Sequence, residues 1–140
     1  MITKGLIDEV FVIRELDLII KIHSIISSIN QYPEEFVLYE APLVIIKSFV
    51  VTDRISRSTV MAINDKRRDQ PLIITNLHNQ SRVIDGNHRL IKREVDGFLN
   101  CYFYLVPPEK LINFSVPISD FKTERRYIKW KKQVFGEQLA

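Results

Sequence analysis

The 140-residue chain contains a single cysteine, Cys101. One cysteine cannot form an internal disulfide, and it cannot supply a zinc site that needs several cysteines. A reducing, cytoplasmic setting is therefore expected. Cys101 alternates with aromatic residues in an apolar segment, and nothing nearby makes its surroundings electropositive. We therefore expect a small, buried core residue and not a reactive thiol.

The early part of the chain has no long uninterrupted apolar run. Charged residues break up its first apolar segments: Asp8, Glu9, Arg14, Glu15, Asp17 and Lys21. Neither a signal peptide nor a membrane-spanning helix is expected, and hence no membrane partner. The sequence also has no internal repeat and no low-complexity linker.

Composition and charge indicate one folded domain with an uneven charge distribution. The chain is 46% hydrophobic and 26% charged, as in globular proteins with a core, and 140 residues suit a single domain. Residues 1–80 hold 9 Lys/Arg and 10 Asp/Glu (9 − 10 = −1), whereas residues 81–140 hold 11 and 7 (11 − 7 = +4). The basic excess of the second part favours an anionic partner.

The most informative stretch spans residues 82–97. Near its start, Val83 and Ile84 are β-branched and favour extended backbone, and Asp85-Gly86 is a turn signal. Apolar residues then recur at helical spacing: Leu90, Ile91 and Val95. Gly97 stands where a glycine commonly follows a helix. The stretch therefore predicts a strand, a tight turn and a helix over residues 87–96.

The start of this helix has the chemistry of an anion site. Asn87, His88 and Arg89 fall in the first turn, where backbone N–H groups lack intrahelical partners and the helix dipole is positive. His88 and Arg89 add side-chain donors, and Gly86 permits close approach of a ligand to the backbone. Phosphate binding is one interpretation. The alternative is that Asp85 only caps the helix and the two side chains are solvated. An arginine in the first turn, such as Arg89, is not expected in the core.

The segment Ile-Asp-Gly-Asn-His-Arg-Leu (84–90), followed by a helix, a glycine and an apolar strand, resembles the signature of the ParB/sulfiredoxin-like superfamily. Members carry an Asp-Gly-x-His-Arg or Gly-Gly-Cys-His-Arg box. The resemblance covers roughly Tyr39 to Val106, and the box is its specific part. It implies a small α/β domain that binds a nucleotide, with the box at the phosphates. Known members include CTP-dependent DNA-partition proteins, ATP-dependent sulfinic-acid reductases and a free-serine kinase.

We therefore expect a single α/β domain with a mixed sheet of ParB/sulfiredoxin-like topology. Its core would span about residues 36–106, between a helical N-terminal extension (1–35) and a basic helical C-terminal extension (107–140). In the first extension, the spacing of Leu16, Ile19, Ile20, His23 and Ile26 predicts a helix, with a strand as an alternative for part of it.

Apolar patterns and turn residues predict the other elements. Strands are expected at 36–39, 43–51, 71–77 and 100–106, with a hairpin turn at 78–81. Helices are expected at 55–64 after a cap at Thr52-Asp53, at 108–114, and from a cap at Ser119-Asp120 to Phe135, ended by Gly136. Residues 66–70 are expected to form a polar loop.

Candidate functional residues follow from the box and from the resemblance. Asp85 is a candidate catalytic residue and a ligand for Mg²⁺, which prefers one or two carboxylates together with phosphate oxygens. In kinase-like relatives a glutamate from the early strand region serves as a base, and the resemblance implies Glu40 for that role. The nucleotide-binding candidates are Gly86, Asn87, His88 and Arg89, joined by Arg54 and Arg57 from a facing loop.

Two classes of function remain open. The first is an enzyme that uses a nucleoside triphosphate with Mg²⁺, as an ATP- or CTP-dependent phosphotransferase or NTPase. Sulfinic-acid reduction is excluded because Asn87 occupies the position of that family's catalytic cysteine. The alternative is a non-catalytic DNA- or protein-binding regulatory or inhibitor module of a mobile element, without the helix-turn-helix of partition proteins.

The C-terminal helix offers a separate surface. Its basic residues are Lys122, Arg125, Arg126, Lys129, Lys131 and Lys132. They indicate either a solvated amphipathic helix or a contact with nucleic acid or with an acidic protein.

Overall fold

A β-hairpin leads the chain into the Asp-Gly box. The computed structural model describes residues 9–50 and 55–136. Strands β4 (Leu72–Leu77) and β5 (Gln80–Asp85) pair antiparallel. The turn residues between them, His78 and Asn79, have positive φ angles of 52° and 60°, which match the right-handed twist of a two-residue hairpin. The predicted strand, turn and return strand are confirmed.

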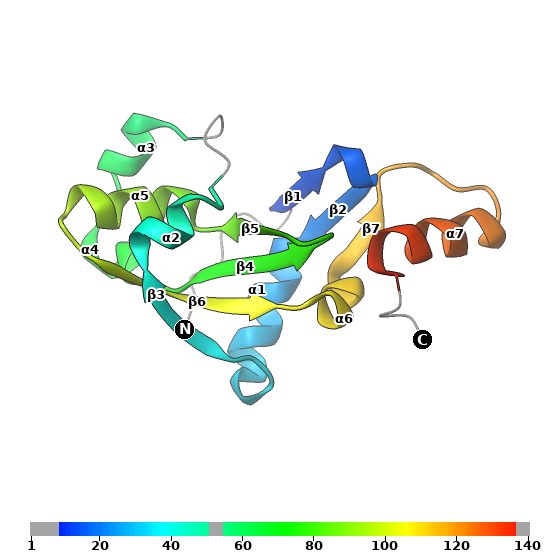
Figure 1. Cartoon of the computed structure of the whole chain (residues 1–140), viewed down its shortest axis with the longest axis horizontal. Coiled ribbons are helices and arrows are strands. Elements are labelled where there is room, and N and C mark those ends of the chain that lie inside the picture. Colours follow the sequence, from blue (N-terminus) through cyan, green and yellow to red (C-terminus); the bar gives the residue numbers. More distant parts are fainter. Residues whose placement is uncertain (1–8, 51–54, 137–140) are drawn as a thin grey trace.

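The hairpin belongs to a four-stranded mixed sheet with the order β3-β6-β4-β5 (Figure 1). Strand β6 (Asn100–Val106) is parallel to β4, and the edge strand β3 (Leu38–Pro42) is antiparallel to β6. Helix α5 (Asn87–Val95) connects β5 to β6. The predicted helix after the box and the predicted strand at 100–106 are therefore confirmed, as is the mixed character of the sheet.

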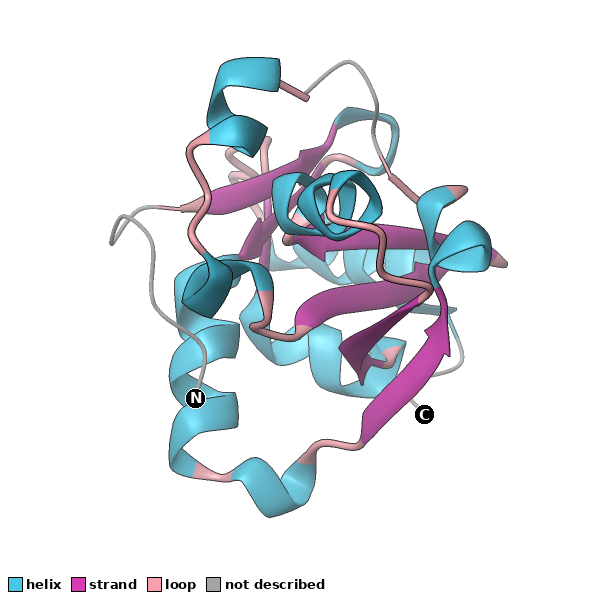
Figure 2. Cartoon of the chain, turned by 90° about the vertical axis from the view of Figure 1, so that its left-hand side faces the viewer, coloured by secondary structure: helices cyan, strands magenta, loops and turns pink. Residues whose placement is uncertain are grey.

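A second, three-stranded antiparallel sheet has the order β1-β2-β7. Its strands are β1 (Val10–Ile13), β2 (Leu18–Lys21) and β7 (Ser115–Pro117). A 3₁₀ turn (Arg14–Leu16) joins the first two strands. Helix α1 (Ile22–Gln31) follows β2 directly, and helix α7 (Glu124–Phe135) lies near the C-terminus. The side view in Figure 2 shows helices on several sides of the strands.

Short helices complete the described chain. They are α2 (Leu43–Lys47), α3 (Arg57–Met61), α4 (Asp65–Arg68) and α6 (Pro108–Leu111), with 3₁₀ turns at Pro33–Glu35 and Ile112–Phe114. No helix of the described residues is both long enough and apolar enough to cross a membrane.

The apolar core has two parts. The larger one joins α1, α7 and the three-stranded sheet to the hairpin, through Ile73, Leu77 and Ile84 among others. The smaller one lies between α5, α2 and the four-stranded sheet, and it contains Leu90 and Cys101. Cys101 is 0% exposed, and burial raises the pKa of its thiol. Its predicted place in the core is thus confirmed.

The N-terminal extension is not purely helical. Residues 18–21 form β2 and the helix begins only at Ile22, so the alternative of a strand for part of this segment is the correct one. Asp17 has a φ of 54° at the end of the 3₁₀ turn that joins β1 to β2. Leu18 and Ile20 are both 0% exposed on one face of β2, an alternation that suits a strand.

The predicted strand over residues 43–51 is wrong at its start, where the structure has helix α2. The prediction assumed that a continuous apolar run is buried on both faces. Only Leu43 and Ile46 are buried, three residues apart on one helical face, whereas the two residues between them are 77% and 53% exposed. Helix α2 therefore buries Leu43 and Ile46 and leaves Val44 and Ile45 exposed to solvent.

Other boundaries also differ from the prediction. The polar loop at 66–70 begins as helix α4, because the Asn64 side chain accepts a hydrogen bond from the Arg67 N–H. Ser56 is the N-cap of α3. Thr123, and not Ser119-Asp120, caps α7, which ends before Gly136 as expected. Residues 51–54, including the predicted cap at Thr52-Asp53, lie outside the described residues.

Candidate functional site

Gly86 makes the turn between β5 and α5. It has a φ of 97°, in the left-handed region that favours glycine. A Cβ at this position would lie 2.5 Å from Leu72 Cδ2 and 2.8 Å from Arg89 Nη2. The turn therefore requires glycine for two reasons, backbone conformation and space.

The N-terminus of α5 opens on a pocket of about 220 Å³. No side chain of the described residues caps this end of the helix. Within the described part of the chain, the N–H groups of its first turn therefore have no side-chain partner of the kind that most helix starts have. The pocket is lined by the box and by residues of three other segments: Glu9, Val10, Phe11, Thr59, Ile63, Arg67, Ile84, Asp85, Gly86, Asn87, His88 and Arg89.

Arg89 differs from the surface residue that the sequence suggested. Only 3% of it is exposed, and Nη2 donates to the Pro71 carbonyl at 2.9 Å and to Asp85 Oδ2 at 3.1 Å. Its Nε is also buried and contacts no acceptor among the described residues. The expectation that a first-turn arginine stays out of the core is wrong. Asp85, the last residue of β5, forms an ion pair with Arg89 at 3.1 Å, so the two charges neutralise each other.

His88 links α5 to α3. Its Nε2 accepts a hydrogen bond from the Ser56 N–H at 3.1 Å, which requires a neutral ring with the proton on Nδ1. Burial lowers the pKa of His88, which favours that neutral form. Ser56 is the N-cap of α3, so the imidazole fixes the start of α3 against the box.

Asp85 has a second carboxyl group beside it, that of Glu9. Burial raises the pKa of Glu9 first, and the charge of Asp85 and a hydrogen bond with it raise the pKa further, whereas Arg89 and Arg67 lower it. Two carboxyls and two guanidinium groups thus meet at one pocket. Such a set can bind an anion through its cations, and it can hold a divalent cation only together with further oxygen ligands.

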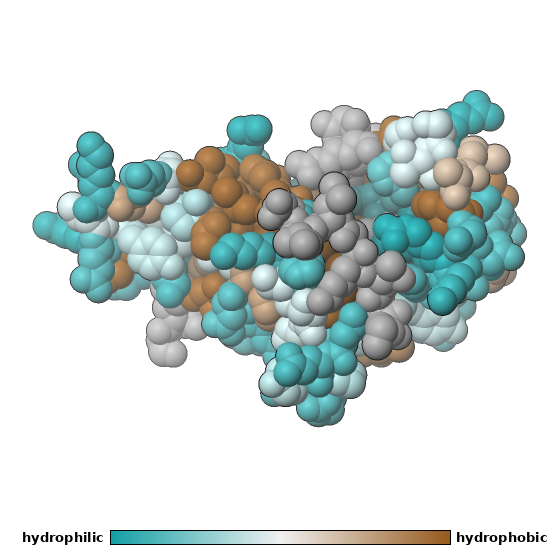
Figure 3. All heavy atoms as spheres, turned by 180° about the vertical axis from the view of Figure 1, so that it is seen from behind, coloured by the Kyte–Doolittle hydropathy of each residue, from teal (hydrophilic) through white to brown (hydrophobic). Residues whose placement is uncertain are grey.

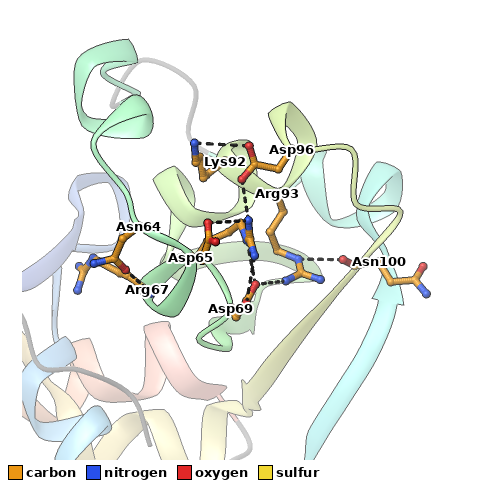
Figure 4. A network of polar contacts seen from close by, with 9 residues as sticks. Asn64, Asp65, Arg67, Asp69, Lys92, Arg93, Asp96 and Asn100 are labelled. Carbon is orange, nitrogen blue, oxygen red and sulfur yellow. Dashed lines mark hydrogen bonds and ion pairs between the residues drawn. The ribbon is translucent and has the colours of Figure 1, made fainter.

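Helix α4 brings Arg67 to the pocket. A network of ion pairs holds this helix against α5 (Figure 4). Arg68 pairs with Asp65, Asp69 and Asp96 at 2.9–3.1 Å. From α5, Arg93 Nη1 donates to Asp69 at 3.2 Å, and its Nε donates to the Asn100 carbonyl at 3.0 Å.

An aromatic ring reinforces this network. The guanidinium carbons of Arg68 and Arg93 lie 4.6 and 4.4 Å from the centre of the Phe98 ring. The network therefore joins α4, α5 and the start of β6. It holds α4, and with it Arg67, beside the pocket.

Two of the described residues that were predicted for the site, Glu40 and Arg57, do not line this pocket. Glu40 lies on the edge strand β3, where its Oε2 accepts a hydrogen bond from Asn100 Nδ2 at 3.2 Å. It lines a separate shallow hollow together with Asp69 and Tyr102. Arg54 lies outside the described residues.

The sequence analysis missed Glu9, Thr59 and Arg67 as pocket residues. Arg67 belongs to a run of polar residues, and nothing in that run shows which part of the fold its side chain faces. Glu9 precedes an apolar strand and belongs to no motif. Only the pairing of β1 with β2 and the packing of α3 and α4 beside α5 bring these segments to the box. No sequence signal identifies them.

Comparisons of the chain with models of protein families, with curated proteins and with solved structures find no match. Among the described residues, no group of three or more His, Cys, Asp or Glu side chains is placed to hold a metal ion.

Proposed function

We propose that the protein is a ParB/sulfiredoxin-like domain that binds the phosphate groups of a nucleoside triphosphate at the N-terminus of α5. The observation that supports this most is the first turn of α5, which no described side chain caps and which opens on a pocket beside Gly86, where a Cβ would be crowded. Backbone N–H groups and the helix dipole at such a site favour anions. Arg67 adds a guanidinium group at the pocket wall.

The size of the pocket limits which part of the nucleotide enters. Pockets for whole small molecules typically measure about 300–1,000 Å³. At about 220 Å³ this one suits phosphate groups but not a nucleoside as well. We therefore propose that the phosphates occupy the pocket and that the sugar and base lie outside it.

Phosphoryl transfer or hydrolysis of the triphosphate is the reaction class that such a site supports. Most of the catalysis in this class comes from positioning and from neutralising charge. Mg²⁺ would supply that neutralisation, and Asp85 and Glu9 are the carboxylates that would hold it together with phosphate oxygens. Glu9, and not Glu40, is the second carboxylate of the proposed site.

Arg67 offers the sharpest test, because its neighbour is a matched control. Both Arg67→Gln and Lys66→Gln remove one positive charge from α4, but only Arg67 lines the pocket. Titration calorimetry with ATP, CTP and GTP, each with Mg²⁺, should give an affinity that Arg67→Gln lowers roughly tenfold to a hundredfold, the value of one charge-assisted hydrogen bond. Lys66→Gln should bind as the wild type does.

Two further ligands separate phosphate recognition from base recognition. Inorganic tripolyphosphate should compete with the nucleotide, and the nucleoside alone should not. Absence of binding by every nucleotide and by tripolyphosphate at millimolar concentration would contradict the proposal. It would leave the non-catalytic binding module as the better description. Equal losses in the Arg67 and Lys66 variants would also contradict it.

A further inference from the structure

Helix α7 carries a row of cations on its solvent-facing side. At 3.6 residues per turn, Arg125, Arg126, Lys129 and Lys132 fall within an arc of roughly 120°, and the buried Trp130 and Val134 lie outside it, about 40° and 80° beyond Arg126. All four basic residues are exposed. In the view from behind, hydrophilic atoms project from the end of the molecule that carries α7 (Figure 3).

These cations are not neutralised by the described part of the chain. None of the ion pairs between described residues involves any of the four. Glu124, the one acidic residue of α7, lies outside the arc because it is angularly distant from Lys129 on the helix. The row therefore presents a concentrated positive charge to solvent, in the half of the chain that has the basic excess.

We propose that this row, the α7 basic face (Arg125, Arg126, Lys129 and Lys132), binds the phosphate backbone of duplex DNA. At 1.5 Å per residue the row is about 10 Å long. One strand of a duplex advances by about 3.4 Å per phosphate along the duplex axis, so a row of this length laid along the axis spans about three phosphates. The rigid helix keeps the four cations together over that length.

The composition of the face distinguishes this partner from an acidic protein. Protein interfaces draw most of their affinity from buried aromatic or apolar anchors. The arc contains no apolar side chain, and its one other member is Gln133. Interfaces with DNA are by contrast polar and strongly positive, as this face is.

The aromatic residues of α7 also argue against single strands as the preferred partner. Proteins that bind single strands stack bases on exposed aromatic rings. Trp130 is 5% exposed and its Nε1 donates to the Leu16 carbonyl at 3.1 Å, and Tyr127 packs against it at 5.6 Å between ring centres. Both rings pack against the core. The α7 arc therefore offers positive charge but neither ring as an exposed surface on which a base could stack.

The test is the salt dependence of DNA binding, measured by fluorescence anisotropy with a short duplex of mixed sequence. Each phosphate contact contributes about 0.9 to the slope of log affinity against log salt concentration. Lys129→Gln combined with Lys132→Gln should therefore lower that slope by about 1.8. The matched control is Lys21→Gln with Lys66→Gln, which removes the same charge from exposed positions outside α7 and should leave the slope unchanged.

A second variant shows whether a change in the salt slope comes from lost charge or from a disturbed fold. Lys129→Arg with Lys132→Arg retains the charge and should retain the wild-type slope. Three results would overturn the proposal: no binding to duplex DNA at low salt, equal slope changes in the α7 and control variants, or tighter binding to polyglutamate or to a single strand than to the duplex. The nucleotide-binding test uses Arg67→Gln, a substitution in α4 that leaves the α7 basic face intact. The result of that test therefore does not change the salt dependence of DNA binding that is expected here.

Discussion

Helices α5 and α7 are both rich in basic residues and use them in opposite ways. Arg89 and Arg93 of α5 are 3% and 7% exposed, whereas Arg125, Arg126 and Lys129 of α7 are exposed. The arginines of α5 hold elements of the fold together. The basic residues of α7 leave their charge available to a partner. The same residue types therefore serve stability in one helix and surface charge in the other.

The difference comes from the acceptors that each helix meets. Around α5, two carboxylates and two backbone carbonyls receive the guanidinium groups: those of Asp85 and Asp69, and of Pro71 and Asn100. A buried charge is tolerated only when it is paired and hydrogen bonded. Beside α7, Arg126 and Lys129 share a hollow with Glu15 and Asp17, but no ion pair between described residues joins these side chains, so the cations stay in water.

The largest effect that would test this comparison is expected from Arg89→Ala. The substitution leaves the buried Asp85 carboxylate without its ion-pair partner. Breaking a buried pair in this way costs about 3–5 kcal/mol of the free energy of unfolding. Arg125→Ala on α7 is the matched control and should change it by less than about 0.5 kcal/mol, as surface substitutions do. Urea denaturation measures both values.

Similar losses in the free energy of unfolding for Arg89→Ala and Arg125→Ala would contradict the distinction between an arginine that stabilises the fold and one that is solvated. A measured loss below about 1 kcal/mol for Arg89→Ala would mean that Asp85 finds other partners, since one neutral hydrogen bond is worth about that much. Nucleotide titrations should therefore not rely on Arg89→Ala, because its effect on folding obscures its effect on binding.

The glycines beside the two helices give a smaller, sharper contrast. Gly86 and Gly136 both have positive φ, so alanine strains the backbone at each position. Only at Gly86 would the new Cβ also collide with Leu72 and Arg89, since nothing lies within 4 Å at Gly136. Gly86→Ala should therefore cost about 1–3 kcal/mol more than Gly136→Ala in the free energy of unfolding, the usual range for overpacking. Equal costs would show that the turn can shift without loss.

The smallest expected effect is a pH dependence from the start of α5. The pKa of His88 is lowered in the folded state from its ordinary value of 6.5, so the unfolded chain binds more protons. Its contribution to stability is therefore present above pH 6.5 and is lost as the pH falls through the lowered pKa. The loss should stay within the value of one hydrogen bond, about 0.5–1.5 kcal/mol.

His88→Gln isolates this contribution, because glutamine does not titrate. The difference in free energy of unfolding between wild type and variant should grow in favour of the wild type as the pH rises toward 6.5. Glu9 acts in the opposite sense: its pKa is raised from 4.5, so the stability it contributes is lost as the pH rises above that value. Measurement of Glu9→Gln over the same range separates the two groups.

Much of the fold around the box followed from local patterns. The hairpin, α5, β6 and the buried Cys101 were predicted because each depends on residues close in sequence: turn residues, helical spacing and strand alternation. The predicted strand at 43–51 failed because an apolar run does not show how much of it will be buried. Glu9 and Arg67 could not be placed at the site, because that requires knowing which distant segments pack beside α5.

The sequence by itself therefore determined the turn at Gly86, the helix that begins after it and the presence of two basic helices. Each is a local consequence of backbone conformation or residue spacing. Only the tertiary structure decided that Arg89 is buried against Asp85, that Glu9 and Arg67 complete the pocket and that the cations of α7 remain in solvent. The physical reason is that solvation and pairing of a charge depend on the surrounding groups, which come from distant parts of the chain.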